Sequence, residues 1–327
     1  MYKCTIAIPT YNRDHCIAEA VESALIQDMQ DMEILVIDDQ STDRTMEIVN
    51  SYSDPRLRII QNDHNVGLFE NFNRCLELAN SQYIKILCDD DKLMPGCIQR
   101  EIRIMDSNKN VVLLFSRGQR VDIFGKTVGP VGDHFKQGIY SGFDSIYAVL
   151  WFKANYGINP ITLPSGVLLR KEAVSKTGWF DTNMKMEGDI DFWLRILEHG
   201  DMAVLKTYSC QIKYHPQQVS HRIIGDIEVI REAFKIAEKF SYILNGHGSY
   251  NKIKQQLFAY PLGIAYRLWR LGLFKESREH VNFVRDSGIS FVSASIAVLR
   301  LLSLRMLMKI AGMRLVPMKL IKTIENV

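Results

Sequence analysis

The sequence predicts an α/β fold in which a mostly parallel sheet is flanked by helices. Three observations support this prediction. Residues 1–120 alternate apolar, β-branched runs with segments of helical spacing. A polar cluster follows each of the first four runs, and after about residue 222 the pattern is helical to the end. Regular alternation of strand and helix is typical of a parallel sheet wrapped by helices.

The strands are predicted from five short apolar runs. They cover residues 4–10, 32–39, 57–62, 83–88 and 111–116. The second run is apolar on both faces, as a central parallel strand would be. Four segments with helical spacing separate the runs, at residues 13–27, 44–52, 67–79 and 95–106, the second of them preceded by the capping sequence Ser41-Thr42-Asp43.

The next hundred residues are less uniform. Residues 121–164 are richer in glycine and aromatic residues and look like an insertion on the substrate side. SGVLLRKEAV then predicts a strand that leads into a helix. A further helix follows at MEGDIDFWLRILEHGD, with Asp189 and Asp191 near its N-terminus, where the helix dipole favours negative charge.

Composition narrows the class of protein. The chain has 327 residues, of which 47% are hydrophobic and 24% charged, as in ordinary globular proteins. A net charge of +3 gives no reason to expect a nucleic-acid partner. The six cysteines form no CxxC pair, which argues against zinc and indicates a reducing compartment. We expect neither a signal peptide nor a membrane-spanning helix, because no apolar run reaches about 18 residues.

Polar side chains gather where the predicted strands end. Thr10-Tyr11-Asn12, Asp38-Asp39, the segment 62–67 and Asp89-Asp90-Asp91 follow four successive strands. Ligands of such sheets bind beyond the carboxyl ends of the strands. Three adjacent carboxylates repel unless a positive charge compensates them, and oxygen ligands suit Mg²⁺ or Mn²⁺. A solvated acidic turn is the simpler alternative.

Four motifs together carry a family resemblance: PTYNR, VIDDQSTD, NVGLFENFNRCLELANSQYIKILCDDDKLMPG and EGDIDFWLRIL. In their order and spacing, over residues 4–222, they resemble the family 2 glycosyltransferases of the GT-A fold, of the bacterial surface-polysaccharide type. The resemblance implies a nucleotide-diphospho-sugar donor, a divalent metal ion and inversion at the anomeric carbon. It also implies a catalytic domain at 1–222, with a nucleotide-binding half (1–120) and an acceptor and catalytic-base half (121–222), before a helical region at 223–327.

Donor-binding residues are carried over by resemblance. Asp39 matches the acid that accepts a hydrogen bond from uracil N–H, so we expect a UDP-linked sugar. Tyr11 would lie against the base, and Asn65 and Gly67 near the ribose and phosphates. The full set expected to bind the nucleotide-sugar is Pro9, Thr10, Tyr11, Asn12, Arg13, Asp39, Asn65, Gly67, Asn73, Asp89 and Asp90.

The acidic triplet resembles the family's metal motif, Asp-x-Asp-Asp. Counting back from Pro95 places this motif on residues 88–91, so that Cys88 replaces the first acid. The resemblance implies that Asp90 binds Mn²⁺ or Mg²⁺ directly and that Asp89 lies near the ribose. Asp91 and His215 are the further metal-site residues, with His221 as the alternative histidine.

The catalytic base is expected in the GDID segment. Transfer with inversion needs a base that takes the proton of the acceptor hydroxyl. Gly188 stands where the family usually has Glu, and Asp189 matches the base, with Asp191 as the alternative. The two acids do not share a helix face, so we expect only one to point into the site. A helix N-cap is the simpler role for Asp189. For Trp179 and Trp193 we expect core packing rather than stacking on a sugar.

Residues 288–316 form a basic, apolar segment of good helical propensity. Such helices can lie in an anionic membrane interface. We therefore expect a cytoplasmic protein that reaches the inner face of the plasma membrane and acts on a glycan or lipid-linked acceptor. The alternative is a helical subdomain that packs on the catalytic domain or on a second copy of the chain.

Three rival functions are weighed. A sugar nucleotidylyltransferase would share the sheet and the acids, but PTYNR lacks the glycine-rich loop that holds a triphosphate. A receiver-like signalling module also ends a strand in paired acids, yet it is much shorter and leaves CDDDK and GDID unexplained. A scaffold of the same fold that binds sugar nucleotide without turnover is disfavoured by the intact acids.

Overall fold

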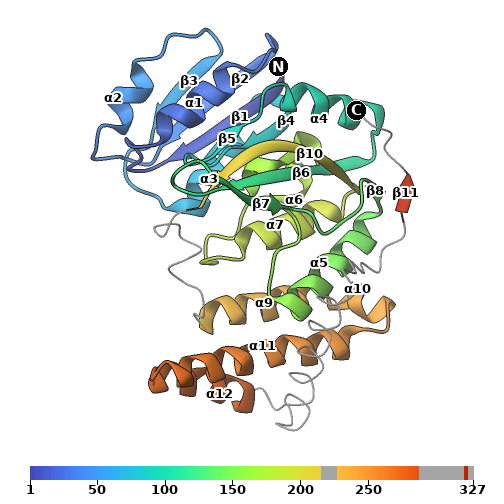
Figure 1. Ribbon diagram of the computed structural model, residues 1–327. Helices are drawn as coiled ribbons and strands as arrows, with labels where there is room; N and C mark the ends of the chain where they lie inside the picture. The colour runs from blue at the N-terminus through green and yellow to red at the C-terminus, as the bar shows by residue number, and fades with distance from the viewer. Residues whose placement is uncertain (215–226, 287–319, 323–327) are drawn as a thin grey trace.

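A computed structural model describes residues 1–214, 227–286 and 320–322 (Figure 1). Its described part is built on one mixed, eleven-stranded sheet. The main path of this sheet runs β11-β8-β10-β6-β9-β4-β1-β2-β3, with β5 paired to β10 and β7 paired to β6. Helices flank the sheet, as expected for the GT-A type of α/β fold.

The N-terminal strands are parallel, as predicted. They are β1 (Tyr2–Thr10), β2 (Met32–Asp38), β3 (Leu57–Gln61) and β4 (Ser81–Ile86). Every residue of β2 is buried, which explains its apolar sequence on both faces. The connecting helices are α1 (Ile17–Leu25), α2 (Thr45–Asn50) and α3 (Leu68–Leu78), and α4 (Cys97–Ser107) follows β4.

The second part of the sheet mixes both directions. Its strands are β5 (Lys92–Leu93), β6 (Val111–Val121), β7 (Thr127–Val131), β8 (Gly138–Tyr140), β9 (Val167–Arg170), β10 (Asp201–Lys213) and β11 (Leu320–Lys322). β9 pairs antiparallel with β4 on one side and with β6 on the other. β10 runs parallel to β6 and antiparallel to β5 and β8. β10, the longest strand of the described sheet, was not predicted from the sequence.

The remaining helices follow along the chain. They are α5 (Gly142–Tyr156), α6 (Lys171–Thr177), α7 (Gly188–Leu197), α9 (Ile227–Lys239), α10 (Ser241–Gly246), α11 (Tyr250–Arg270) and α12 (Phe274–Asp286), and a 3₁₀ turn, η1, covers Pro164–Gly166. Figure 1 shows α9, α11 and α12 gathered at the end of the molecule away from β1–β3. In the described ranges, no helix is both long and apolar enough to span a bilayer. The basic segment 288–316 lies outside the described residues.

Two helices differ from the sequence prediction. α1 begins at Ile17 rather than at residue 13, because the backbone amides of residues 12–14 donate to side chains of the 41–45 segment instead of entering a helix. The region 121–164 was expected to be irregular, yet it contains α5. This helix buries apolar side chains on several faces, which weakens the amphipathic pattern that reveals a surface helix.

The two tryptophans near α7 lie in different environments. Trp193 is buried and packs edge-on against Phe180, as predicted. Trp179 was expected in the core, and this prediction is wrong: its side chain is 50% exposed. The backbone carbonyl of Trp179 accepts a hydrogen bond from Arg195, which fixes the turn while leaving the indole outside.

Candidate active site

A cavity of about 520 Å³ opens at the carboxyl ends of β1, β2 and β4. Since parallel strands end at the same edge of a sheet, residues distant in sequence meet there. The cavity is lined by Pro9, Thr10, Tyr11, Asn12, Arg13, Asp39, Asn65, Gly67, Leu68, Phe69, Asn71, Phe72, Cys88, Asp89, Asp90, Asp91, Leu163, Pro164, Met186 and Asp189. Most residues proposed for the donor, the metal and the base therefore share one pocket.

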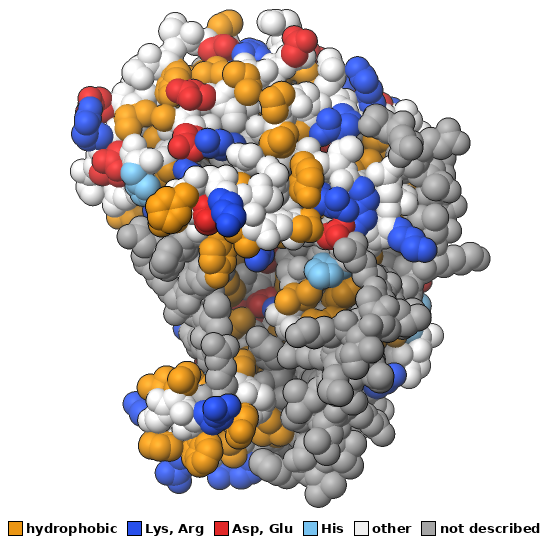
Figure 2. Space-filling view, viewed as in Figure 1, with side chains coloured by type: hydrophobic (Ala, Val, Ile, Leu, Met, Phe, Trp, Pro, Cys, Tyr) orange, Lys and Arg blue, Asp and Glu red, His pale blue; other side chains and the backbone are white. Residues whose placement is uncertain are grey.

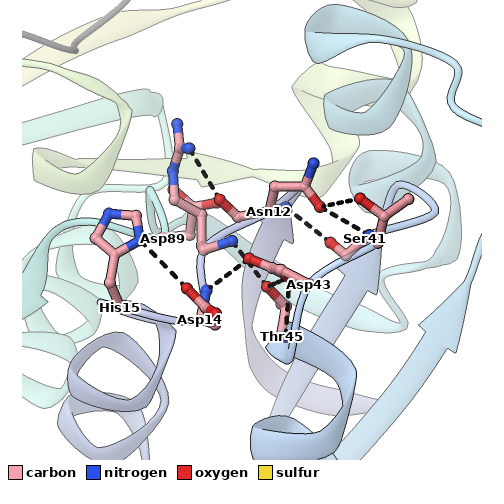
Figure 3. A network of polar contacts seen from close by, with 9 residues as sticks. Asn12, Asp14, His15, Ser41, Asp43, Thr45 and Asp89 are labelled. Carbon is pink, nitrogen blue, oxygen red and sulfur yellow. Dashed lines mark hydrogen bonds and ion pairs between the residues drawn. The ribbon is translucent and has the colours of Figure 1, made fainter.

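The loop after β1 is held by polar contacts with the segment before α2 (Figure 3). Asn12 adopts a left-handed backbone conformation, with φ of 53°, which Asn tolerates better than most residues. Its N–H donates to Ser41 Oγ over 2.8 Å, and its Oδ1 accepts from the Thr42 amide over 2.8 Å. The next amide, of Arg13, donates to Thr45 Oγ1 over 2.7 Å. These bonds present Tyr11 and Asn12 to the cavity.

Asp39 organises the loop that leads into α3. Its Oδ1 accepts from Asn62 Nδ2 and from the Val66 amide, each over 2.8 Å, and its Oδ2 accepts from the Gly67 amide over 2.9 Å. Gly67 has φ of 90°, a conformation that favours glycine. Asp39 thus has a structural task besides the proposed contact with a base, and its Oδ2 retains a second lone pair for such a donor.

The first acid of the triplet faces the loop after β1. Arg13 Nε donates to Asp89 Oδ1 over 3.2 Å (Figure 3). Withdrawal from water raises the pKa of Asp89 to about 6, although the Arg13 guanidinium acts in the opposite direction. The pair ties the end of β4 to the loop after β1.

The third acid is withdrawn into the protein. Asp91 is buried, its Oδ2 accepts from Ser165 Oγ over 2.6 Å, and its Oδ1 accepts from the Lys213 amide over 3.3 Å. The same Ser165 oxygen accepts from the Cys88 amide over 3.0 Å. Burial raises the pKa of Asp91 well above its usual range. Asp91 therefore braces the acidic turn from behind.

These residues can hold a hard divalent ion only if substrate phosphates and water complete its coordination. No group of three or more His, Cys, Asp or Glu side chains converges as a metal site within the described ranges. Asp90 lines the cavity between two acids that have protein partners. Mg²⁺ is commonly held by one or two carboxylates, substrate phosphates and water, so the donor set fits such an ion. His215 and His221 lie outside the described residues.

Asp189, at the start of α7, lines the same cavity. Its Oδ2 accepts from Asn159 Nδ2 over 3.2 Å, and its Oδ1 accepts from the Ile190 amide over 2.7 Å. Desolvation, with a smaller contribution from Glu187, raises the pKa of Asp189 to about 7. A carboxyl group with such a pKa can accept a proton near neutral pH.

Two predicted site residues do not line the cavity. Asp191 is 0% exposed, and its carboxylate is paired with Arg195 over 2.8 Å and with Lys239 over 2.7 Å, so the structure gives it no access to a substrate. Asn73 points into the protein, where its Nδ2 donates to the Phe180 carbonyl over 3.1 Å and its Oδ1 accepts from the Phe180 amide over 2.7 Å. Asp191 is therefore placed in ion pairs within the protein and Asn73 in hydrogen bonds to the Phe180 backbone, and neither lines the cavity.

Sequence reasoning missed several residues of the site. Ser165 and Asn159 carry the hydrogen bonds to Asp91 and Asp189, but single polar residues in a loop give no pattern. Phe69 explains why a glycine fits at position 188, where the resemblance led us to expect Glu: a Cβ on Gly188 would lie 2.6 Å from the Phe69 ring. Of these residues, only Gly188 was marked in the sequence, because it stands where the resemblance led us to expect Glu.

Comparison with known proteins identifies the family. The profile described as "Glycosyl transferase family 2" matches residues 5–174. The chain therefore belongs to glycosyl transferase family 2, and its sheet with flanking helices is that of the GT-A fold.

Curated relatives resemble parts of the chain. An uncharacterized protein of Mycobacterium tuberculosis is 29% identical over 59% of this chain and 61% of its own length. The Escherichia coli UDP-Glc:alpha-D-GlcNAc-diphosphoundecaprenol beta-1,3-glucosyltransferase WfgD is 30% identical over 39% of this chain and 52% of its own length. The chain thus spans less than two thirds of these relatives.

Solved structures share the fold at low identity. Staphylococcus aureus TarS 1–349 in complex with UDP-GlcNAc is 17% identical, with a TM-score of 0.56 over 87% of this chain and 92% of that chain. The Pyrobaculum calidifontis mannosyltransferase PcManGT, in complex with GDP-Man and Mn²⁺, is 15% identical, with a TM-score of 0.52 over 94% of this chain and 81% of that one.

Proposed function

We propose that the protein transfers a sugar from a nucleotide-diphospho-sugar to an acceptor hydroxyl by a single inverting displacement. The observation that carries the proposal is the position of Asp189. This carboxyl group, with a pKa of about 7, lies on the same cavity as the acids that end β4 and the loop that follows β1. Such a displacement requires a base and, on the same cavity, carboxylates that can hold a cation to stabilise the leaving diphosphate.

The proposed step has three concerted parts. The acceptor oxygen forms a bond to the anomeric carbon, while the bond from that carbon to the diphosphate oxygen breaks and its electron pair leaves with the nucleoside diphosphate. The hydroxyl proton passes to the Asp189 carboxylate. The Asn159 amide group and the Ile190 N–H hold the two carboxylate oxygens, so the base is oriented before the acceptor arrives.

A divalent cation belongs to the proposal as a cofactor, Mn²⁺ or Mg²⁺. When bound, it would neutralise the charge that develops on the leaving diphosphate. Asp90 would hold it from the protein side, with Asp91 behind it through the acidic turn. Arg13, tied to Asp89, places a positive charge beside the same turn.

We assign a UDP-linked donor on two grounds. Asp39 lies on the cavity with one oxygen that can accept a further hydrogen bond, and an N–H such as that of uracil supplies one. TarS, of similar fold, was solved with UDP and with UDP-GlcNAc, although PcManGT was solved with GDP-Man. Half-exposed Tyr11 offers a ring face at the rim of the cavity for the base.

The acceptor is proposed to be a lipid-linked saccharide reached at a membrane surface. WfgD, by its name, acts on a diphosphoundecaprenol-linked sugar. Figure 2 shows hydrophobic side chains beside Lys and Arg over the tip of the α11–α12 hairpin, at the lower left. The exposed residues there are Tyr266, Trp269, Leu271, Leu273 and Phe274, with the cations Arg270, Lys275 and Arg278. This mixture suits an anionic bilayer interface.

The test measures donor binding and transfer separately. Wild type and Asp189→Asn are titrated with UDP and a panel of UDP-sugars in the presence of Mn²⁺, and UDP release is followed with a bacterial lipid extract as acceptor. We expect Asp189→Asn to bind the donor as wild type does and to lose transfer by about 10²- to 10⁴-fold. Asp28→Asn, in an exposed loop position outside the polar clusters at the strand ends, is the matched control.

Two outcomes would reject the proposal. Full transfer by Asp189→Asn would remove the base from this position. Donor binding by wild type without UDP release, with every sugar and acceptor tried, would favour the scaffold of the same fold.

A further inference from the structure

Glu232 of α9 binds the turn that leads into the helix of the proposed base. Glu232 is 5% exposed, and its carboxylate accepts from three successive backbone amides: Lys185 over 2.5 Å, Met186 over 3.1 Å and Glu187 over 3.0 Å. Residue 232 lies well outside the segment 5–174 that the family profile matches. The contact therefore comes from the C-terminal helical region of this chain.

The chemistry of this contact is that of an anion in a backbone nest. The amides that precede a helix have no partners within it, and the helix dipole adds partial positive charge at that end. Three successive N–H groups form a concavity that fits a carboxylate. A buried carboxylate is costly without such donors, so the turn and Glu232 stabilise one another.

A second contact joins the same two helices. Lys239, about two turns further along the same face of α9, lies 2.7 Å from the buried Asp191 carboxylate, which Arg195 also contacts within α7. Asp189 thus lies in sequence between two residues that α9 contacts. Glu232 accepts a hydrogen bond from the Glu187 amide, and Lys239 donates one to the Asp191 carboxylate. Helix α9 fixes α7 on both sides of the proposed base.

We propose that Glu232 is a positioning residue that sets the place of Asp189 in the cavity. The proposal rests on the proposed function, since it concerns the same base. Met186 and Asp189 both line the cavity. The Glu232 contacts fix the backbone of Met186 and of Glu187, two residues before Asp189. A shift of about 1 Å in a reacting group is enough to lower a rate by about 10²-fold.

The experiment compares Glu232→Ala and Glu232→Gln with Glu238→Ala, an exposed residue of the same helix. Hydrogen exchange is followed by mass spectrometry, and kcat, the donor Kd and Tm are measured on the full chain. In Glu232→Ala we expect faster exchange confined to residues 184–192, a kcat about 10- to 100-fold lower, and a donor Kd within about twofold of wild type. Gln, which retains one acceptor oxygen, should fall between Ala and wild type.

Three results would overturn the positioning role. One is exchange at residues 184–192 that equals wild type in Glu232→Ala. Another is a kcat within about twofold of wild type despite faster exchange. The third is a parallel loss of donor binding, Tm and protection in β1 and β2, which would mean a general structural role. Hydrogen exchange needs no substrate. The contact between Glu232 and residues 185–187 can therefore be tested even if Asp189→Asn has shown that Asp189 is not the base.

Discussion

Ser165 Oγ lies 2.6 Å from Asp91 Oδ2, a contact that joins two residues 74 positions apart. The hydroxyl donates to the buried carboxylate and accepts from the Cys88 amide. A residue of the 3₁₀ turn before β9 thereby supports the acidic turn after β4. The support has measurable consequences.

Ser165→Ala should leave the Asp91 carboxylate and the Cys88 amide short of a partner. A buried polar group that loses its hydrogen bond costs about 1–3 kcal/mol, and we expect a loss of stability of this size in urea unfolding. The donor should also bind more weakly, because the acidic turn loses its brace. Ser175→Ala, at an exposed position of α6, is the control, and equal stability of the two variants would contradict the prediction.

Asp90→Asn should abolish metal-dependent binding of the nucleotide. The substitution keeps the shape of the side chain but removes the charge that attracts the cation. Calorimetric titration with UDP, with Mn²⁺ and with a chelator, should show Mn²⁺-dependent binding for wild type and none for the variant. Affinity that does not change with the variant would take Asp90 out of the metal site.

Transfer should rise with pH through about 7. The base must be deprotonated, and burial raises the pKa of Asp189 to about 7, so the carboxylate becomes the major form only above that pH. The amide group of Asn159 lowers this pKa by its hydrogen bond. Asn159→Ala should therefore move the acidic limb of the kcat/KM profile to higher pH. If the acidic limb of the profile stays in place or moves to lower pH, it reflects the titration of a group other than Asp189.

Gly188→Ala should destabilise the protein although alanine favours helices. The added Cβ would lie 2.6 Å from the Phe69 ring, which is stacked on Phe180 and would have to shift to make room. Overpacking costs about 1–3 kcal/mol against a gain of at most about 1 kcal/mol in helix propensity.

Two companion variants test that cause in thermal unfolding. Phe69→Leu in the same chain should recover part of the loss, because the smaller side chain leaves space for the Cβ. Gly263→Ala, where no described atom beyond the chain neighbours and the backbone of its own helix lies within 4 Å of the added carbon, should be neutral or stabilising. A Gly188→Ala variant as stable as wild type would mean that Phe69 yields without cost.

The α11–α12 tip should bind anionic vesicles. Trp269 is 58% exposed and Phe274 62% exposed, so replacing both by Ala removes apolar surface that a bilayer interface would bury. We expect vesicle binding to fall about tenfold or more, and to weaken with salt. Ile123→Ala with Phe124→Ala, an exposed pair near the β6–β7 turn, should have no effect. Equal binding to neutral vesicles would exclude the electrostatic part of the contact.

The sequence predicted the first four strands and the convergence of polar residues at their ends. These features follow from local patterns: β-branched runs form strands, and parallel strands end at one edge. The cavity accordingly gathers Tyr11, Asp39, Asp90 and Asp189 from four separate segments.

The parts that sequence reasoning missed depend on contacts between distant segments. Asp191 faces α9 and Asp189 faces the cavity, a difference that helix geometry predicted without saying which acid faces which way. Ser165 and Glu232 contact residues 74 and 45 to 47 positions away, and nothing in their neighbourhood in the sequence marks them. Asn73 looked like a ligand because it follows a motif, but it holds Phe180.

The place of β9 in the sheet restricts how the protein can move. Because β9 pairs with β4 and with β6, the strands that carry the acidic turn and those of the second half form one continuous ladder. A hinge rotation of one half against the other would break the ladder at β9, whereas hinge-type enzymes rotate about a few loop residues. We therefore expect the protein to admit and release its substrates by movements of individual loops, with the sheet behaving as a single rigid plate.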